Sequence, residues 1–219
     1  MPDFRLKDLA LKGHIDTSRL DNYNLRKPTV KFALSQALFH PTPRLPVRGK
    51  EAIFPSNEQL KPLIALSSSW LQVLPSSDKE VKQLQRTTLL VADEGGMGKT
   101  YSCSIALNWI LETKGNAVVV ICPPSLLENW NIMLKKFGHQ PNWLKGNQLA
   151  EGRLEDGINL ISTYTVQKYP IGPIIQDRIK ERLSAVLIDE AHRGMIADNV
   201  LRDSISSVCS VAEQRILVT

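Results

Sequence analysis

Residues 92–100 read Ala-Asp-Glu-Gly-Gly-Met-Gly-Lys-Thr, and this stretch decides the fold. It follows the short apolar run Leu89-Leu90-Val91 and precedes a helical pattern. We therefore expect a strand, a glycine-rich turn and the start of a helix. In such a turn, backbone N–H groups and the positive end of the helix dipole surround phosphate oxygens. The stretch thus predicts a phosphate-binding loop.

The residues of this loop have predicted roles in holding ATP. Lys99 would reach the β- and γ-phosphates, and the Thr100 hydroxyl would ligate Mg²⁺. The general phosphate-loop pattern has a glycine five residues before Gly98, where this chain has Asp93, so only the Gly-x-Gly-Lys-Thr end is present. The turn residues expected to contact the nucleotide are Gly95, Gly96, Met97 and Gly98.

A second motif, Asp189-Glu190-Ala191-His192, follows the apolar run 185–188. A carboxylate at the end of a buried strand is poorly solvated, which disfavours it unless it has a partner. It fits a site where Asp189 holds the Mg²⁺ of ATP through water and Glu190 orients and deprotonates the attacking water. The alternative is that the acidic pair only caps the following helix. The phosphate loop upstream favours the catalytic interpretation.

Beyond Val91, apolar runs alternate with helical stretches. Strands are expected near 87–92, 117–122, 158–163, 185–188 and 215–218. Helices are expected near 99–113, 125–137, 173–183 and 198–210. Continuous Val, Ile and Leu runs are typical of strands buried on both faces. The alternation predicts an α/β fold, with a mostly parallel sheet and helices on both faces. Ligands bind at the carboxyl ends of such strands, where Lys99, Asp189 and Thr219 fall.

Two further segments complete a family pattern. Residues 118–130 read Val-Val-Val-Ile-Cys-Pro-Pro-Ser-Leu-Leu-Glu-Asn-Trp, and residues 158–164 read Ile-Asn-Leu-Ile-Ser-Thr-Tyr. With these motifs the chain resembles the ATPase motor of helicase superfamily two, most closely its SWI/SNF-type branch of double-strand DNA translocases. That branch typically shows Asp-Glu-x-Gly-x-Gly-Lys-Thr, Cys-Pro-x-Ser-Leu-x-x-x-Trp and Asp-Glu-x-His, here in DEAH-box form. Residues 215–219, Arg-Ile-Leu-Val-Thr, look like the start of its next motif.

The resemblance implies a RecA-like P-loop NTPase lobe over residues 53–219, with ATP and Mg²⁺ as cofactors and DNA, double-stranded, as partner. Family members have a second RecA-like lobe whose arginine fingers raise the rate by several powers of ten. That lobe is absent from these 219 residues, so we expect the chain alone to bind nucleotide and hydrolyse it weakly. Residues 1–52 are expected to form a basic, proline-containing N-terminal extension.

The resemblance also assigns contacts to nucleic acid and to adenine. Residues expected to contact the phosphates of one strand are Ser125, Asn129, Ser162 and Thr163. An alternative for Ser125 is a helix cap paired with Glu128. Trp130 fits a core position better than a base-stacking one. Gln59 is the candidate for reading the adenine edge, with Gln72 as its rival. His192 is expected to couple the nucleotide site to the nucleic-acid side, unless it is a plain surface histidine.

Composition and charge bound the remaining possibilities. With 42% hydrophobic residues, 219 residues can bury one α/β core. Residues 1–50 hold ten Lys or Arg against four Asp, a balance of +6, whereas the remainder balances at −1 to give the total of +5. This basic segment fits either phosphate contact or docking to other subunits. Three singly spaced cysteines and the absence of a long apolar run indicate a soluble, non-secreted protein, cytoplasmic or nuclear.

Two other functions compete with the DNA translocase. One is a strand-separating or RNA helicase on the same fold, which the residues at 93–100 and 123–130 disfavour. The other is a non-catalytic nucleotide-binding scaffold or interaction module. Such a module has no physical need of an intact set of ATPase side chains, and the chain keeps them: Lys99, Thr100, Asp189 and Glu190.

Overall fold

The computed structural model describes most of the chain from residue 87 onward and parts of what precedes it. The described residues are 45–47, 50–53, 55–56, 58–63, 65–66, 87–93, 96–114, 116–146, 148, 154–169, 171, 183–196 and 199–219. Gly95, Gln72 and most of the helix expected near 173–183 lie outside them, as do residues 1–44 of the predicted extension.

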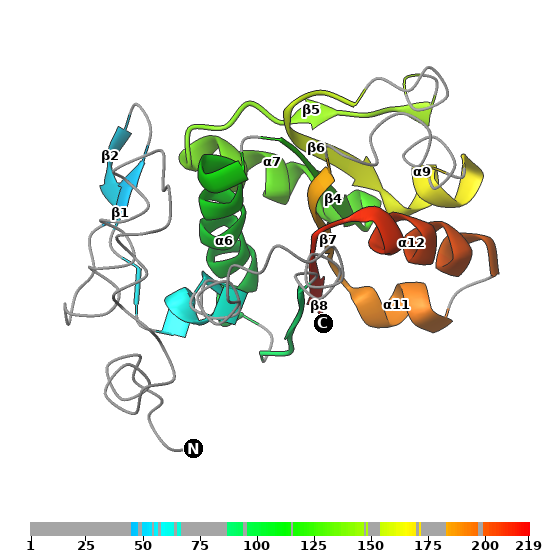
Figure 1. Ribbon diagram of the computed structural model, residues 1–219, viewed down its shortest axis with the longest axis horizontal. Helices are drawn as coiled ribbons and strands as arrows, with labels where there is room; N and C mark the ends of the chain where they lie inside the picture. The colour runs from blue at the N-terminus through cyan, green and yellow to red at the C-terminus, as the bar shows by residue number, and fades with distance from the viewer. Residues whose placement is uncertain are drawn as a thin grey trace, which may run out of the picture.

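A six-stranded parallel sheet forms the centre of the molecule (Figure 1). Its order is β3-β8-β7-β4-β6-β5, and every pairing is parallel. The strands are β3 (Thr87–Val91), β4 (Ala117–Cys122), β5 (Asn142–Trp143), β6 (Gly157–Ser162), β7 (Leu183–Ile188) and β8 (Gln214–Val218). The predicted α/β fold with a parallel sheet is therefore confirmed.

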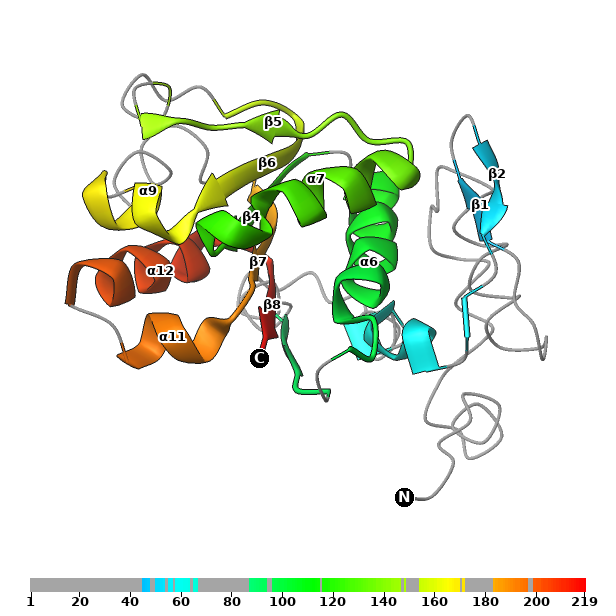
Figure 2. The same cartoon turned by 180° about the vertical axis from the view of Figure 1, so that it is seen from behind.

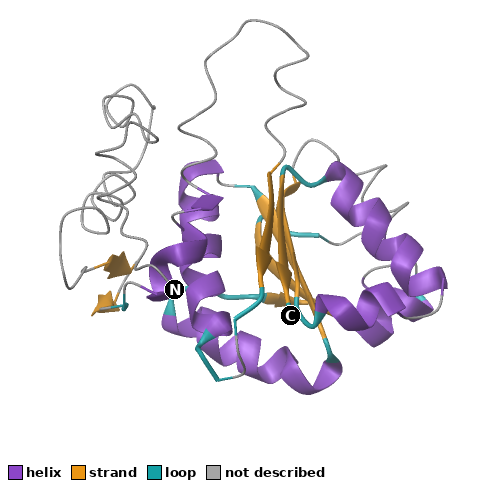
Figure 3. Ribbon diagram, turned by 90° about the horizontal axis from the view of Figure 1, so that it is seen from below, coloured by secondary structure: helices purple, strands orange, loops and turns teal. Residues whose placement is uncertain are grey.

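Helices cover both faces of this sheet, as Figure 3 shows with the strands seen nearly edge-on. On one face lie α6 (Lys99–Lys114), the short turn η2 (Pro124–Leu126) and α7 (Leu127–Lys136). On the other lie α9 (Thr163–Lys168), α11 (Ala191–Ile196) and α12 (Asn199–Val211). Two separate apolar cores result, one on each side of the strands. The view from behind, in Figure 2, shows α7 crossing in front of β4 beside α6.

Helix α6 is apolar on nearly all sides because it packs between two layers. Its inner side faces the sheet, and its outer side meets η1 (Glu58–Leu60) and the helical residues that follow. Leu60, Leu63 and Leu66 are buried in the same core cluster as α6. Burial raises the pKa of the Cys103 thiol in α6 to about 12, so this cysteine stays protonated as a small core residue.

The structure differs from the predicted elements at three places. The strand expected to reach residue 163 ends at Ser162, because the Ser162 hydroxyl accepts the Thr165 N–H and starts α9. The two residues of β5 and the six of α11 are too short to give a periodic signal. Near the N-terminus, β1 (Leu45–Val47) pairs antiparallel with β2 (Lys50–Ile53), which runs across the predicted boundary at residue 52. Among the described residues, no helix has the length and apolar character to cross a membrane.

Helix α7 ends in a glycine-dependent turn. Gly138 N–H donates to the Lys135 carbonyl at 3.0 Å, and His139 N–H donates to the Leu134 carbonyl at 3.2 Å. These two bonds satisfy carbonyls that the helix end leaves open, and they require a left-handed residue after the helix. Gly138 supplies it with φ +81°. The turn fixes where α7 ends at the amino end of the sheet.

Asn159 is a buried amide that ties three segments together. Its Oδ1 accepts Asn142 Nδ2–H and the Glu155 N–H, both at 3.1 Å. Its Nδ2 donates to the Glu155 carbonyl at 2.8 Å and the Val118 carbonyl at 3.3 Å. All the hydrogen-bonding capacity of this amide is used inside the protein, so strands β4, β5 and β6 are held in register by a group that water does not reach.

We expect Asn159→Ala to lower the free energy of unfolding by about 2–4 kcal/mol, because four backbone or side-chain groups lose a partner, among them the buried Val118 carbonyl. Asn142→Ala is the matched control, since it removes only one of these bonds. Urea denaturation would measure both variants. An equal loss in the two would show that Asn159 does not organise this corner of the sheet.

Candidate nucleotide-binding site

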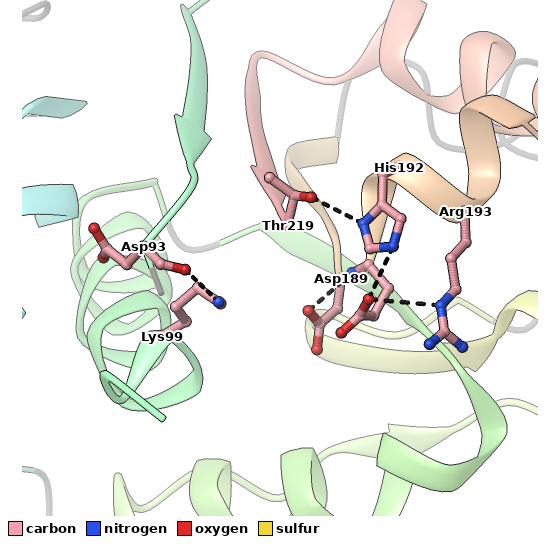
Figure 4. A network of polar contacts seen from close by, with 7 residues as sticks. Asp93, Lys99, Asp189, His192, Arg193 and Thr219 are labelled. Carbon is pink, nitrogen blue, oxygen red and sulfur yellow. Dashed lines mark hydrogen bonds and ion pairs between the residues drawn. The ribbon is translucent and has the colours of Figure 1, made fainter. Parts of the chain in front are cut away.

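The predicted phosphate loop lies between the end of β3 and the start of α6. Gly96 and Gly98 have φ values of +82° and +79°, so the loop uses a backbone conformation that other residues rarely adopt. Lys99 Nζ donates to the Asp93 carbonyl at 2.6 Å, which draws the ammonium across the mouth of the loop (Figure 4). Asp93, at the position where the general pattern has glycine, thus contributes its backbone and not its side chain to this contact.

Gln59 lies directly against the phosphate loop. A side-chain carbon at position 98 would be 3.3 Å from Gln59 Nε2, so only glycine fits there without displacing the amide. The same glutamine starts the helical segment that covers α6: its Oε1 accepts the Ser56 N–H at 3.0 Å, and its own N–H donates to Ser56 Oγ at 3.3 Å. The capping box fixes the amide, with the donor group Nε2 on the loop side.

Asp189 follows β7 at the same edge of the sheet and is almost fully buried, with 7% of its surface exposed. Its Oδ2 accepts the Trp130 indole N–H at 2.8 Å, and its Oδ1 accepts the Glu190 N–H at 2.9 Å. Burial raises the pKa of this carboxyl, while the two hydrogen bonds and the Lys99 ammonium act in the opposite direction. Lys99, after the loop that follows β3, and Asp189, after β7, both lie beyond the carboxyl ends of strands of one parallel sheet.

Glu190 sits in a strained turn beside Asp189. Its φ is +53°, and no other non-glycine residue in the described part of the chain has a positive φ. Its carboxylate lies 3.3 Å from His192 Nε2 and 3.6 Å from Arg193 Nε. His192 Nδ1 in turn lies 2.8 Å from Thr219 Oγ1, at the end of β8 (Figure 4). The histidine therefore bridges Glu190 and the residue after β8.

The oxygen donors at this edge fit Mg²⁺. The ion prefers hard oxygen ligands and is commonly held by one or two protein groups together with phosphate and water. Thr100 supplies a hydroxyl in the first turn of α6, and Asp189 supplies two carboxylate oxygens. Each of the two Asp189 oxygens accepts one of the hydrogen bonds described above and keeps a second lone pair for a metal-bound water.

The residues predicted to contact nucleic acid fall into two groups. Ser125 and Asn129 are exposed near the start of α7. Neither η2 nor α7 has a side-chain cap, so the alternative that Ser125 caps a helix is wrong. Ser162 is buried, and its hydroxyl bonds Thr165 N–H at 2.9 Å and Thr165 Oγ1 at 2.7 Å. Its hydroxyl is thus occupied inside the protein.

That second segment still reaches the surface through the residues next to Ser162. Thr163 is half-buried, and the ring of Tyr164 is 63% exposed. A phosphate contact here would therefore come from the first turn of α9 and not from the Ser162 hydroxyl.

Two side chains of the site were not assigned from the sequence. Trp130 was expected to be a core residue and is one, but its indole N–H also reaches the Asp189 carboxylate. The sequence assigns no role to Arg193 of α11, which pairs with Glu190, the residue just before that helix. The contact between Arg193 and Glu190 could have been found from the three-residue spacing of opposite charges. The contact between Trp130 and Asp189 joins residues 59 positions apart, so no local pattern predicts it.

Comparison with solved structures supports the fold. Among solved structures the chain is similar to the SWI2/SNF2 ATPase core of Sulfolobus solfataricus in complex with double-stranded DNA, with a TM-score of 0.52, 23% identity and 74% of this chain covered. The chain spans 31% of the length of that structure. It is less similar to the C-terminal domain of a possible DNA helicase from Lactobacillus plantarum WCFS1, with a TM-score of 0.40, 14% identity, and 75% of this chain and 85% of that one covered.

Sequence comparisons give the family. No curated protein sequence is significantly similar to the chain. A family model, that of the SNF2-related domain, matches residues 56–219. The match covers well over half of the chain and includes both the phosphate loop and the Asp189-Glu190 turn, so the chain belongs to the SNF2-related domain family.

Proposed function

We propose that residues 53–219 form the ATP-binding first lobe of a DNA-dependent ATPase, a motor that translocates on double-stranded DNA. The observation that carries the proposal is the placement of Lys99, after the loop that follows β3, and of the Asp189-Glu190 pair, after β7, at the carboxyl edge of one parallel sheet. A phosphate cradle facing a buried carboxylate suits a metal–nucleotide complex.

Within this lobe, the loop residues from Gly95 to Gly98 hold phosphate oxygens through backbone N–H groups. Lys99 leaves the Asp93 carbonyl and neutralises the β- and γ-phosphates, and Gln59 Nε2 donates to the adenine edge. Thr100 and Asp189 hold Mg²⁺, which when bound polarises the phosphoryl group and offsets its charge. These roles follow the donor and acceptor chemistry of each side chain.

Glu190 is the proposed base that orients and deprotonates the attacking water. Its contacts with His192 and Arg193 keep the carboxylate at the N-terminal end of α11. His192 also contacts Thr219, which continues the β3–β8 ladder through its N–H to the Val91 carbonyl at 3.0 Å. A displacement of Thr219 at the end of β8 would therefore move the His192 imidazole and, through it, the Glu190 carboxylate. This supports the proposed coupling role of His192.

DNA is the proposed partner of the surface formed by η2 and the first turns of α7 and α9. Ser125, Asn129 and Thr163 can donate hydrogen bonds to phosphates there, contacts that position a duplex without reading its sequence. The similar Sulfolobus structure was solved with double-stranded DNA, which supports a duplex. The basic excess of residues 1–52 suits added phosphate contacts or binding to another subunit. A second RecA-like lobe supplies the charge that completes the site, so this chain alone hydrolyses ATP weakly.

The first test separates nucleotide binding from hydrolysis in the full-length natural protein. We expect Lys99→Ala to weaken Mg–ATP binding roughly 10- to 100-fold, because a charged hydrogen bond to phosphate is lost. Glu190→Gln should bind ATP normally and hydrolyse it about 10²- to 10⁴-fold more slowly. Lys136→Ala, an exposed lysine in the last turn of α7, is the charge-matched control. Normal ATPase activity in Glu190→Gln would remove Glu190 as the base.

The second test identifies the nucleic-acid partner. We expect ATP hydrolysis by the full-length protein to be stimulated by duplex DNA more strongly than by single-stranded DNA or RNA, each compared with no nucleic acid. Stimulation by single strands or RNA alone would favour a strand-separating or RNA helicase. Mg–ATP binding without hydrolysis under every condition would favour a non-catalytic scaffold.

The third test concerns the glycine at the centre of the loop. Gly98→Ala and Gly138→Ala each place a side chain on a left-handed residue, so we expect both to lower stability by about 1–2 kcal/mol. Only Gly98→Ala should also weaken Mg–ATP binding, by roughly tenfold or more, because it displaces Gln59 and the backbone donors of the loop. Calorimetric titration would measure the affinity. Equal nucleotide affinities in the two variants would mean that the loop does not hold the phosphates.

A further inference from the structure

Among the described residues, Trp130 is the buried side chain of α7 that bonds the Asp189 carboxylate, the proposed metal ligand. It is fully buried, and its indole N–H donates to Asp189 Oδ2 at 2.8 Å. An indole nitrogen can donate and cannot accept, so it pairs only with an acceptor such as a carboxylate oxygen. The remaining indole surface packs in the core cluster beside α6. Packing therefore fixes the donor, and the donor fixes the carboxylate.

The orientation of the Asp189 carboxylate is set by two donors from different parts of the chain. Oδ1 is held by the N–H of the next residue, Glu190, and Oδ2 is held by Trp130. The first is local and comes with the turn. The second crosses from α7 to the end of β7, so it depends on where α7 lies. Without Trp130, Oδ2 would be a buried acceptor with no donor, and the carboxylate would rotate or take up a proton.

We infer that Trp130 is a positioning residue: its indole N–H holds the Asp189 carboxylate in the orientation that binds the nucleotide's Mg²⁺. Asn129, a proposed phosphate contact, is its neighbour in the same turn of α7, and Ser125 lies just before this helix. The helix that presents these residues to nucleic acid thus also carries the donor of the metal site. The inference rests on the proposed function and extends it to a residue outside the ATPase motifs themselves.

The test is to remove the N–H and keep the ring in the full-length protein. We expect Trp130→Phe to weaken Mg–nucleotide binding about 10- to 100-fold, the usual effect of losing a hydrogen-bond partner of a metal ligand. Affinity for the same nucleotide in EDTA should stay unchanged. Trp109→Phe is the matched control, because Trp109 is 4% exposed in the same core cluster and lies ten residues beyond Lys99 along α6. Both variants should lose stability, but only Trp130→Phe should lose the part of the nucleotide affinity that depends on Mg²⁺.

A second variant guards against poor folding of Trp130→Phe. β-3-Benzothienylalanine at position 130 keeps both rings and replaces the N–H by sulfur, so it removes the donor with little change in volume. We expect the same loss of Mg²⁺-dependent affinity. If this variant and Trp130→Phe bind Mg–nucleotide as the unchanged protein does, the positioning role is wrong and the proposed function stands. If the variants at position 130 lost nucleotide affinity equally with Mg²⁺ and in EDTA, the positioning role would also be wrong, because the loss would not depend on the metal. If the unchanged protein binds no nucleotide, the proposed function fails and this inference with it.

Discussion

The structure of the site depends on keeping one carboxylate, Asp189, charged where water hardly reaches. Burial alone would favour its neutral form, as the raised pKa shows. The N–H donors of Trp130 and Glu190 and the Lys99 ammonium oppose this effect. The donors come from α7 and from the turn after β7, and the ammonium comes from the phosphate loop. The position of α7, the turn at Glu190 and the order of the strands are thus all constrained by the same charge.

The turn at Glu190 shows how this constraint reaches the proposed base. A left-handed conformation at a non-glycine residue costs about 1–2 kcal/mol, so something must hold it. Here the Glu190 N–H is held by Asp189, and the side chain is held by His192 and Arg193. The strained backbone turns the two neighbouring carboxylates into different surroundings, one buried beside Trp130 and one partly exposed beside α11. Two adjacent acids can therefore have different roles, one at the metal and one at water.

The sequence predicted the sheet well because its signal is local. Runs such as Val118-Val-Val-Ile are apolar and bounded by turn residues, and the strand expected near 117–122 has the bounds of β4. Helix α9 was missed because Thr163-Tyr-Thr-Val favours a strand by composition. The Ser162 cap decides otherwise, and a cap is visible only once the end of β6 is known. The loop and the Asp189 turn were found from their motifs, whereas the Trp130 donor depends on packing between distant segments.

Ser125 and Ser162 show where transfer of residue roles by motif reaches its limit. Both are serines of a family motif, Ser125 in the turn η2 after β4 and Ser162 at the end of β6, and both were predicted to contact phosphates. The structure leaves Ser125 exposed on an uncapped turn and uses the Ser162 hydroxyl to begin a helix. A hydroxyl satisfied inside the protein gains little from a phosphate, because it must first give up its partner. Exposure and existing hydrogen bonds, and not residue type, therefore decide which of these two hydroxyls is available to a phosphate.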